Sequence, residues 1–142
     1  MSFLKVSQLD RSCYFRGLLV LAGKDRLVDP RERALMLQFG DLLDFDKRFC
    51  EAAIDDLLEN RHINSDAVVF ADRGIAECFL RDALRLAHVD ENLHRQELAW
   101  LEAVACANGL TEEWIHAEAR RLHEEKDPPL DLPSSLAIRQ YL

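Results

Sequence analysis

The chain has 142 residues, of which 49% are apolar and 31% are charged. This apolar content is too high for a disordered chain and is sufficient for the core of one ordinary domain. Asp and Glu number 26 and Lys and Arg number 18, so the net charge is −8. A surface with this charge repels phosphate backbones and anionic lipids, which argues against nucleic acids and membrane surfaces as partners.

The N-terminal segment MSFLKVSQLD lacks the pattern of a signal peptide, because Lys5, Ser7 and Gln8 interrupt its apolar residues. Apolar runs such as 18–22 are far too short to cross a membrane. The four cysteines, at positions 13, 50, 78 and 106, form no CxxC pair and each lies in an apolar stretch. We interpret them as buried free thiols, and we therefore expect a protein of the reducing cytoplasm.

Apolar residues recur with helical spacing along most of the chain. They predict helices over residues 7–23, 29–43, 46–60, 74–88, 95–108 and 111–126, and a short seventh helix over 134–142. Ser7 and Thr111 are expected N-caps, and Asp29-Pro30-Arg31-Glu32 resembles a capping box. The second helix should place its apolar face on Leu35, Met36, Phe39, Leu42 and Leu43.

The segment 66–71 (DAVVFA) is the least clear part of the pattern. It could form a short strand, but the sequence predicts no partner strand for it. We therefore expect a packed connection between two helices, with Phe70 as its aromatic anchor.

The sequence contains an internal repeat, because a shift of 65 residues overlays it on itself without a gap. Residues 13–58 then align with residues 78–123, and ten of these 46 positions are identical. We therefore expect a single all-α domain over 1–142, in which two three-helix units pack about a pseudo-twofold axis and a tail follows over 128–142. The matched apolar positions predict the following buried residues: Phe15, Leu19, Phe39, Phe49, Ile54, Phe79, Leu84, Leu101 and Trp114.

One polar spacing occurs in both halves. Asp25 and Glu32 are seven residues apart, as are Asp90 and Glu97. Each Asp follows one predicted helix and each Glu opens the next. Two such pairs could converge on a divalent cation, because hard cations prefer carboxylate oxygens. The simpler interpretation is local, since carboxylates at these positions can accept hydrogen bonds from loop and first-turn amides.

The segments LAGKDRLVDPRE and LAHVDENLHRQE resemble the motif A-D-G-x-[IV]-x-x-x-E, which lies between two helices in tellurite-resistance TerB-like domains. Similar domains occur in a membrane-anchored DnaJ-type co-chaperone. Lys24 and Val89 stand where the family has Ala, and Arg26 and Glu91 stand where it has the Gly that allows a left-handed turn. The resemblance, over most of the chain, implies a compact helical fold and a bacterial cytoplasmic protein. It also implies the usual associations of the family, which are metal or oxyanion stress and a cluster of acidic residues.

The pattern Glu-x-x-His occurs three times, as Glu59–His62, Glu91–His94 and Glu113–His116. Di-iron carboxylate proteins use two such pairs together with two further Glu residues inside a four-helix bundle. Here the pairs fall at a helix end, in a loop and at a helix start, whereas that centre requires ligands in the middle of helices. We interpret the lone His88 and His123 as surface or helix-end residues.

The sequence has no nucleotide-binding, P-loop or hydrolase motif, so we predict no catalytic and no cofactor-binding residue. We predict a non-catalytic TerB-like module for interaction or sensing in a stress response. Its candidate metal ligands are Asp25, Glu32, Asp90 and Glu97, which would bind a divalent cation weakly. A metalloenzyme with carboxylate and His ligands and a purely structural adaptor are the alternatives. We expect a protein partner, and a homodimer stays open.

Overall fold

The computed structural model describes residues 7–22, 30–59, 66–88 and 95–124. These residues form six α-helices and no strand, as the sequence predicts. The helices are α1 (Gln8–Ala22), α2 (Pro30–Leu42), α3 (Lys47–Glu59), α4 (Arg73–His88), α5 (Arg95–Ala107) and α6 (Glu112–Glu124). The helix predicted over 134–142 lies outside the described residues. Of the helices described, none is long and apolar enough to cross a membrane.

Short polar side chains close the N-termini of several helices. The Ser7 hydroxyl accepts a hydrogen bond from the Asp10 amide at 3.1 Å, and Thr111 Oγ1 accepts one from the Trp114 amide at 3.1 Å. Both caps agree with the sequence prediction. At the start of α4, Asp72 Oδ1 accepts a hydrogen bond from the Gly74 amide at 2.6 Å. These oxygens satisfy first-turn amides that have no partner within their own helix.

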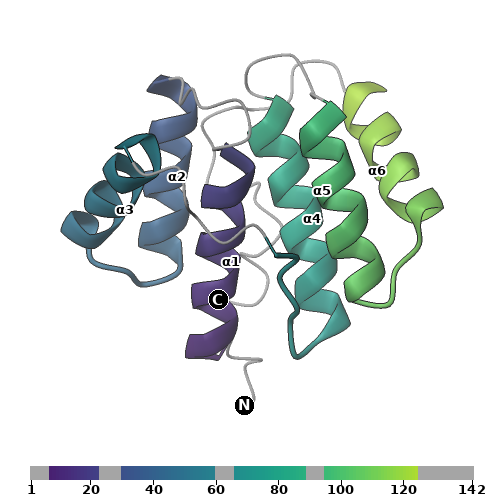
Figure 1. The fold of residues 1–142 in the computed structure, drawn as a ribbon, viewed down its shortest axis with the longest axis horizontal. Coiled ribbons are helices and arrows are strands. Elements are labelled where there is room, and N and C mark those ends of the chain that lie inside the picture. Colours follow the sequence, from purple (N-terminus) through teal and green to yellow (C-terminus); the bar gives the residue numbers. More distant parts are fainter. Residues whose placement is uncertain (1–6, 23–29, 60–65, 89–94, 125–142) are drawn as a thin grey trace.

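The six helices form two similar groups of three (Figure 1). α2 and α3 pack with α1, and α5 and α6 pack with α4. α1 and α4 contact each other and join the two groups. The starts of α1, α2 and α3 recur 65 residues later, from 8 to 73, from 30 to 95 and from 47 to 112. The helix starts therefore recur at the displacement that the sequence repeat has.

Contacts between α1 and α4 are reciprocal. Under the shift of 65 residues, Tyr14 corresponds to Phe79 and Gly17 corresponds to Asp82. The rings of Tyr14 and Phe79 meet edge to face, with 5.2 Å between their centroids. The Tyr14 hydroxyl donates a hydrogen bond to Asp82 Oδ2 at 2.5 Å. The ring of Phe79 packs on Gly17 so closely that a Cβ there would lie 2.5 Å from Phe79 Cζ. Each contact thus has its counterpart across the centre, as a twofold axis between α1 and α4 requires.

The core surrounds this helix pair. Six of the nine residues predicted to be buried are buried, namely Phe15, Phe39, Ile54, Phe79, Leu84 and Leu101. Leu19 and Trp114 are partly buried at the edge of the core. The prediction for Phe49 is wrong, since 55% of this residue is exposed. In α3, which packs on α1 and α2, Cys50 and Ile54 face the core, whereas Phe49 lies at the core's edge with its ring centroid 6.5 Å from that of the buried Phe15.

A side chain of α1 and one from the turn after α5 hold the described part of the connection between α3 and α4, residues 66–72. Asn108 Nδ2 donates a hydrogen bond to the Val68 carbonyl at 2.8 Å, and Asn108 Oδ1 accepts one from the Phe70 amide at 2.9 Å. Asp10 Oδ1 accepts a hydrogen bond from the Ala71 amide at 3.2 Å. Val68 and Phe70 are buried. The segment is therefore a packed connection with Phe70 as an anchor, as predicted, and not a strand.

Candidate functional site

The structure describes one of the four side chains predicted to bind a metal ion. Glu97 lies in the first turn of α5 and is 3% exposed. Asp25 and Asp90 lie outside the described residues, and for Glu32 in α2 only the backbone is described. Among the side chains that are described, no three of His, Cys, Asp or Glu lie together in a way that could hold a metal ion. Cation binding by the two acidic loops stays a prediction.

Of the three Glu-x-x-His pairs, one has both side chains described. Glu113 and His116 are exposed at the start of α6. His116 Nε2 lies 2.6 Å from Glu102 Oε2 of α5, so the imidazole pairs with a carboxylate of the neighbouring helix. The ligands of a di-iron centre would instead point into a bundle core. The position of this pair agrees with the sequence interpretation.

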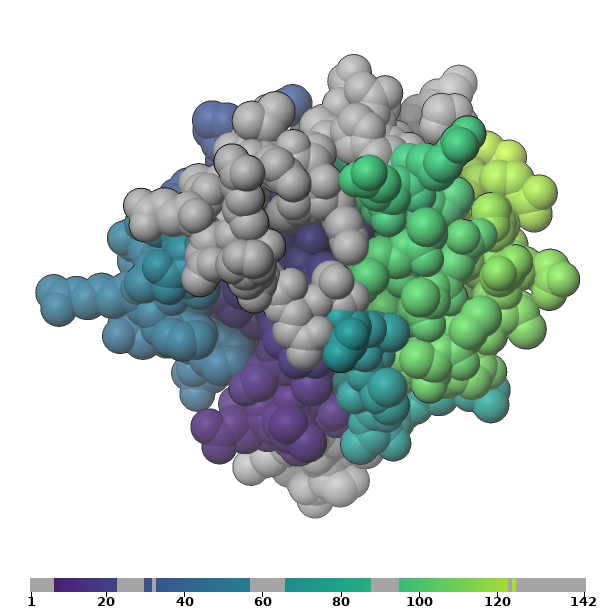
Figure 2. Space-filling model, viewed as in Figure 1, coloured from purple at the N-terminus to yellow at the C-terminus, as the bar shows by residue number. Residues whose placement is uncertain are grey.

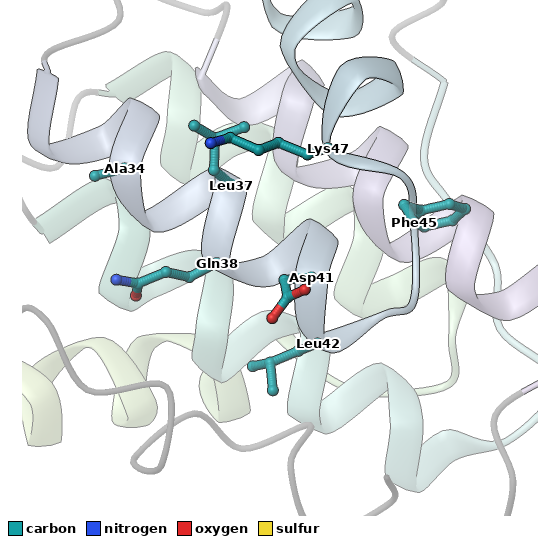
Figure 3. Close-up of a pocket in the computed structure, with 7 residues that line it drawn as sticks. All are labelled: Ala34, Leu37, Gln38, Asp41, Leu42, Phe45 and Lys47. Atoms are coloured by element: carbon teal, nitrogen blue, oxygen red, sulfur yellow. The ribbon is translucent and has the colours of Figure 1, made fainter.

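A hollow of about 570 Å³ runs along the outer side of α2 (Figure 3). We call it the α2 groove, and its lining residues are Ala34, Leu37, Gln38, Asp41, Leu42, Phe45 and Lys47. Five of the lining residues come from α2, and the last four lie three, four, seven and eight positions after Ala34. This spacing places them on one side of a helix. Phe45, from the connection to α3, and Lys47, the first residue of α3, complete the lining.

α2 carries large apolar side chains on two of its faces. Met36 and Phe39 are fully buried in the core, whereas Leu37 and Leu42 are only partly buried. The sequence pattern places Leu42 on the core face and does not identify Leu37. A signal for Leu37 is nevertheless present, because consecutive helical residues are about 100° apart. The run of residues 35–37 is entirely apolar, so it cannot face the core at every position.

An aromatic cluster extends the apolar surface beyond the groove. The ring centroid of Phe45 lies 5.7 Å from that of Phe15 and 5.7 Å from that of Phe49. Phe15 is buried and anchors the cluster in the core, whereas Phe49 is largely exposed. Apolar surface therefore continues from the groove over Phe45 to Phe49.

A left-handed turn after α2 positions Phe45. Asp44 has a φ of 67°, and the Phe45 amide donates a hydrogen bond to the Gly40 carbonyl at 2.8 Å. This is the hydrogen bond of a Schellman motif, which commonly ends a helix. The equivalent turn after α5 has Gly109 with a φ of 80°. The turn therefore belongs to both halves, although only one of them has the Gly that favours it.

The α2 groove lies in an acidic part of the chain. Residues 41–56 include six acidic and two basic side chains. Lys47 Nζ lies 4.0 Å from Glu51 Oε1, so the carboxylate of Glu51 offsets part of the charge of Lys47. Burial raises the pKa of the Cys50 thiol, and the negative charges of Asp46, Asp41 and Glu51 raise it further. The same carboxylates give the surroundings of the groove a negative potential.

The second half has different side chains on the corresponding surface. The shift of 65 residues carries the groove onto Ala99, Glu102, Ala103, Cys106, Ala107, Leu110 and Glu112. Leu37 thus corresponds to Glu102, which pairs with His116. Cys106 is exposed there, so the prediction that all four cysteines are buried is wrong at this position; Cys13 is half-buried. Because α5 has only small or charged residues on this face, the helix arrangement does not require large apolar ones there.

Comparisons with known proteins add no assignment to this geometry. The chain matches no protein-family model, no curated protein and no solved structure. The resemblance to TerB-like domains therefore depends on the two loop motifs, whereas the α2 groove is formed by described residues of α2 and α3 and of the turn between them.

Proposed function

We propose that this protein is a non-catalytic module for interaction or sensing, similar to TerB-like domains, that acts in a cytoplasmic response to tellurite, oxyanion or metal stress by binding a protein partner. The α2 groove is the observation that supports the interaction most directly. Its mainly apolar lining is open at the surface, and a hollow lined by apolar side chains with a few polar groups is a common form of binding site. The stress response is supported by the resemblance of the two loops alone.

Phe49 supports the same proposal from the neighbouring helix. A largely exposed Phe leaves apolar area in contact with water. Removing such area from water is favourable by about 25 cal/mol per Å². Aromatic side chains are also enriched among the residues that dominate binding energies at protein interfaces. In the second half, the equivalent aromatic residue Trp114 is covered by the guanidinium of Arg81, 5.5 Å above its ring. Phe49 is thus an aromatic anchor that a partner would cover.

Weak binding of a divalent cation by Asp25, Glu32, Asp90 and Glu97 is the sensing part of the proposal. The burial of Glu97 shows that this carboxylate is not a surface charge. Its place in the first turn of α5 lets the helix dipole stabilise it without any ion. A cation would therefore add to an interaction that the helix already provides.

Site-specific photo-crosslinking in the source cells tests the proposal. A photoreactive residue at Leu37 should link to a discrete protein. The same residue at Ala99, which is exposed on the corresponding face of α5, should not. The captured protein, once purified, should bind the wild type and should not bind Leu37→Glu. Equal products from both positions, or no product from position 37, would contradict the proposal.

A further inference from the structure

We infer that the α2 groove binds an amphipathic helix of a partner protein whose apolar face is flanked by Lys and Arg. This inference rests on the proposed function and specifies the chemistry of the partner. Three properties of the described residues support it: the shape of the groove, the charge around it and the difference between the two halves.

The shape of the groove suits a helix that lies along α2. From Ala34 to Phe45 the lining extends over about three helical turns, which corresponds to about 16 Å along the axis. Leu37, Leu42 and Phe45 provide apolar contacts along this length, and Phe49 extends them at one end. A helix that binds in such a groove inserts side chains at positions i, i+3, i+4 and i+7. A row of three or four apolar anchors on the partner therefore matches the lining.

The charge around the groove selects basic residues at the edges of that helix. Asp41 lies in the lining itself, and residues 41–56 have six acidic and two basic side chains. Arg33 of α2 pairs with one of the six, Asp55, at 3.0 Å, so a negative excess remains around the groove. Lys47, the one basic residue among the lining residues that the structure describes, lies near Glu51. Flanking Lys or Arg side chains on the partner would complement this surface, which favours both encounter and specificity.

The same charges disfavour two other occupants. A second copy of this chain carries a net charge of −8 and would bring negative charge to a negative surface. The C-terminal segment 125–142 has three acidic and two basic side chains, so it lacks the positive excess that complements the groove. A basic helix from another protein is the occupant that the charges favour.

The repeat provides matched variants for the experiment. Leu37→Glu gives α2 the residue that α5 has at the equivalent position, Glu102. Glu102 pairs with His116, whereas the residue that corresponds to His116 in the first half is Glu51, so the variant changes both the apolar surface and the charge of the groove. Asp41→Lys reverses an exposed charge of the lining and leaves the core unchanged. Ala99→Glu adds one negative charge to the corresponding face of α5 and serves as the control. Circular dichroism should show the same helix content for all three variants.

The probe is an acetylated and amidated peptide of about 18 residues, long enough to form a helix. It has Leu at i, i+3, i+4 and i+7, Lys at positions that flank this row, and Ala elsewhere to favour the helix. One control peptide has Glu in place of every Lys, and a second has the residues of the first in scrambled order. Isothermal titration calorimetry with the full chain measures binding, and sedimentation velocity measures the oligomeric state.

We expect the Lys peptide to bind, and the Glu and scrambled peptides to bind at least about tenfold more weakly. Leu37→Glu and Asp41→Lys should each weaken binding about tenfold or more, whereas Ala99→Glu should not. Raising the salt concentration from about 0.05 to about 0.5 M should also weaken it, because salt screens exposed charges.

Equal affinities for the Lys and Glu peptides, or binding that Leu37→Glu leaves unchanged, would overturn the inference. Concentration-dependent dimers that Leu37→Glu abolishes would overturn it in favour of a second copy. If the peptides fail to bind while crosslinking at position 37 still captures a protein, the basic helix is wrong and the interaction module stands. If both experiments fail, the proposed function fails as well.

Discussion

Tyr14 and Asp82 form a polar pair where α1 and α4 meet, and neither residue has any exposed surface. Burial raises the pKa of Tyr14 well above 10, and the negative charge of Asp82 and the hydrogen bond to it raise the pKa further. A buried hydroxyl or carboxylate that loses its partner costs about 1–3 kcal/mol or more. The pair therefore disfavours any register of α1 on α4 that would separate the Tyr14 hydroxyl from the Asp82 carboxylate.

We expect Tyr14 to stay protonated for as long as the protein stays folded. The chain has two tyrosines, so the variant Tyr141→Phe leaves Tyr14 as the only one. Because the pKa of Tyr14 is higher in the folded than in the unfolded state, the folded state binds more protons above about pH 10, and stability falls as the pH rises further. Tyrosinate absorbance should thus appear together with the loss of helical circular dichroism. Ionisation near pH 10 in a fully helical protein would contradict this expectation.

The four candidate carboxylates allow a second test at the scale of single residues. Both loops lack the Gly of the family motif, so we expect Ca²⁺, Mg²⁺ or Mn²⁺ to raise the Tm of the wild type little or not at all. An ion that binds only the folded state would raise the Tm with ion concentration. Glu32→Gln combined with Glu97→Gln should remove any such rise. A gain of several degrees at sub-millimolar ion that the double variant lacks would show a true cation site.

At the scale of helices, α2 and α5 end in equivalent turns with different residues. The Phe45 amide bonds to the Gly40 carbonyl after α2, and the Leu110 amide bonds to the Ala105 carbonyl after α5, both at 2.8 Å. The residue with positive φ is Asp44 in the first turn and Gly109 in the second. A residue with a Cβ has a higher conformational energy at this φ than Gly has.

We therefore expect Asp44→Gly to stabilise the protein by about 1 kcal/mol and Gly109→Ala to destabilise it by about as much. A Cβ at Gly109 meets no atom within 4 Å, so the second change reports backbone strain rather than a clash. Urea unfolding of the two variants measures both effects. The opposite sign for Asp44→Gly would mean that the Asp44 side chain contributes more to stability than the turn conformation costs.

At the scale of the whole molecule, the two helix groups share one core. α2 and α3 lie on the opposite side of the molecule from α5 and α6 (Figure 2). They are linked through α1 and α4, where Tyr14 packs on both Phe79 and Phe39. Because each group alone would expose the face that now lies between α1 and α4, we expect the groups to unfold together.

The positions of the tryptophans allow a direct test of this cooperativity. Both Trp100 and Trp114 belong to the second group, so their fluorescence reports on that group, whereas circular dichroism reports on all helices. Phe39→Ala, in the first group, should cost about 3–5 kcal/mol because Phe39 is fully buried. The two signals should shift to the same lower urea midpoint. A fluorescence midpoint that stays at the wild-type value would show that the groups unfold separately.

Local interactions explain why the helix bounds could be predicted from the sequence. The caps at Ser7 and Thr111 are hydrogen bonds over three residues, and the turn at Gly109 depends on the φ of one residue. The residues that lie deepest, such as Phe39 and Phe79, were also predictable, because the centre of an apolar stripe faces the core in any packing of amphipathic helices. The internal repeat of the sequence also predicted which helices of the two halves correspond.

Packing between helices accounts for the features that the sequence did not reveal. Helical periodicity gives the direction of an apolar stripe, but the number of neighbouring helices sets how much of its width is covered. α3 and α6 lie at the two sides of the molecule (Figure 1). A residue at the margin of their apolar stripes is therefore buried only if a side chain of a neighbouring helix covers it. Arg81 covers Trp114, while Phe49 is left exposed. The α2 groove arises in the same way, because Leu37 and Leu42 lie beyond the width of α2 that its neighbours bury.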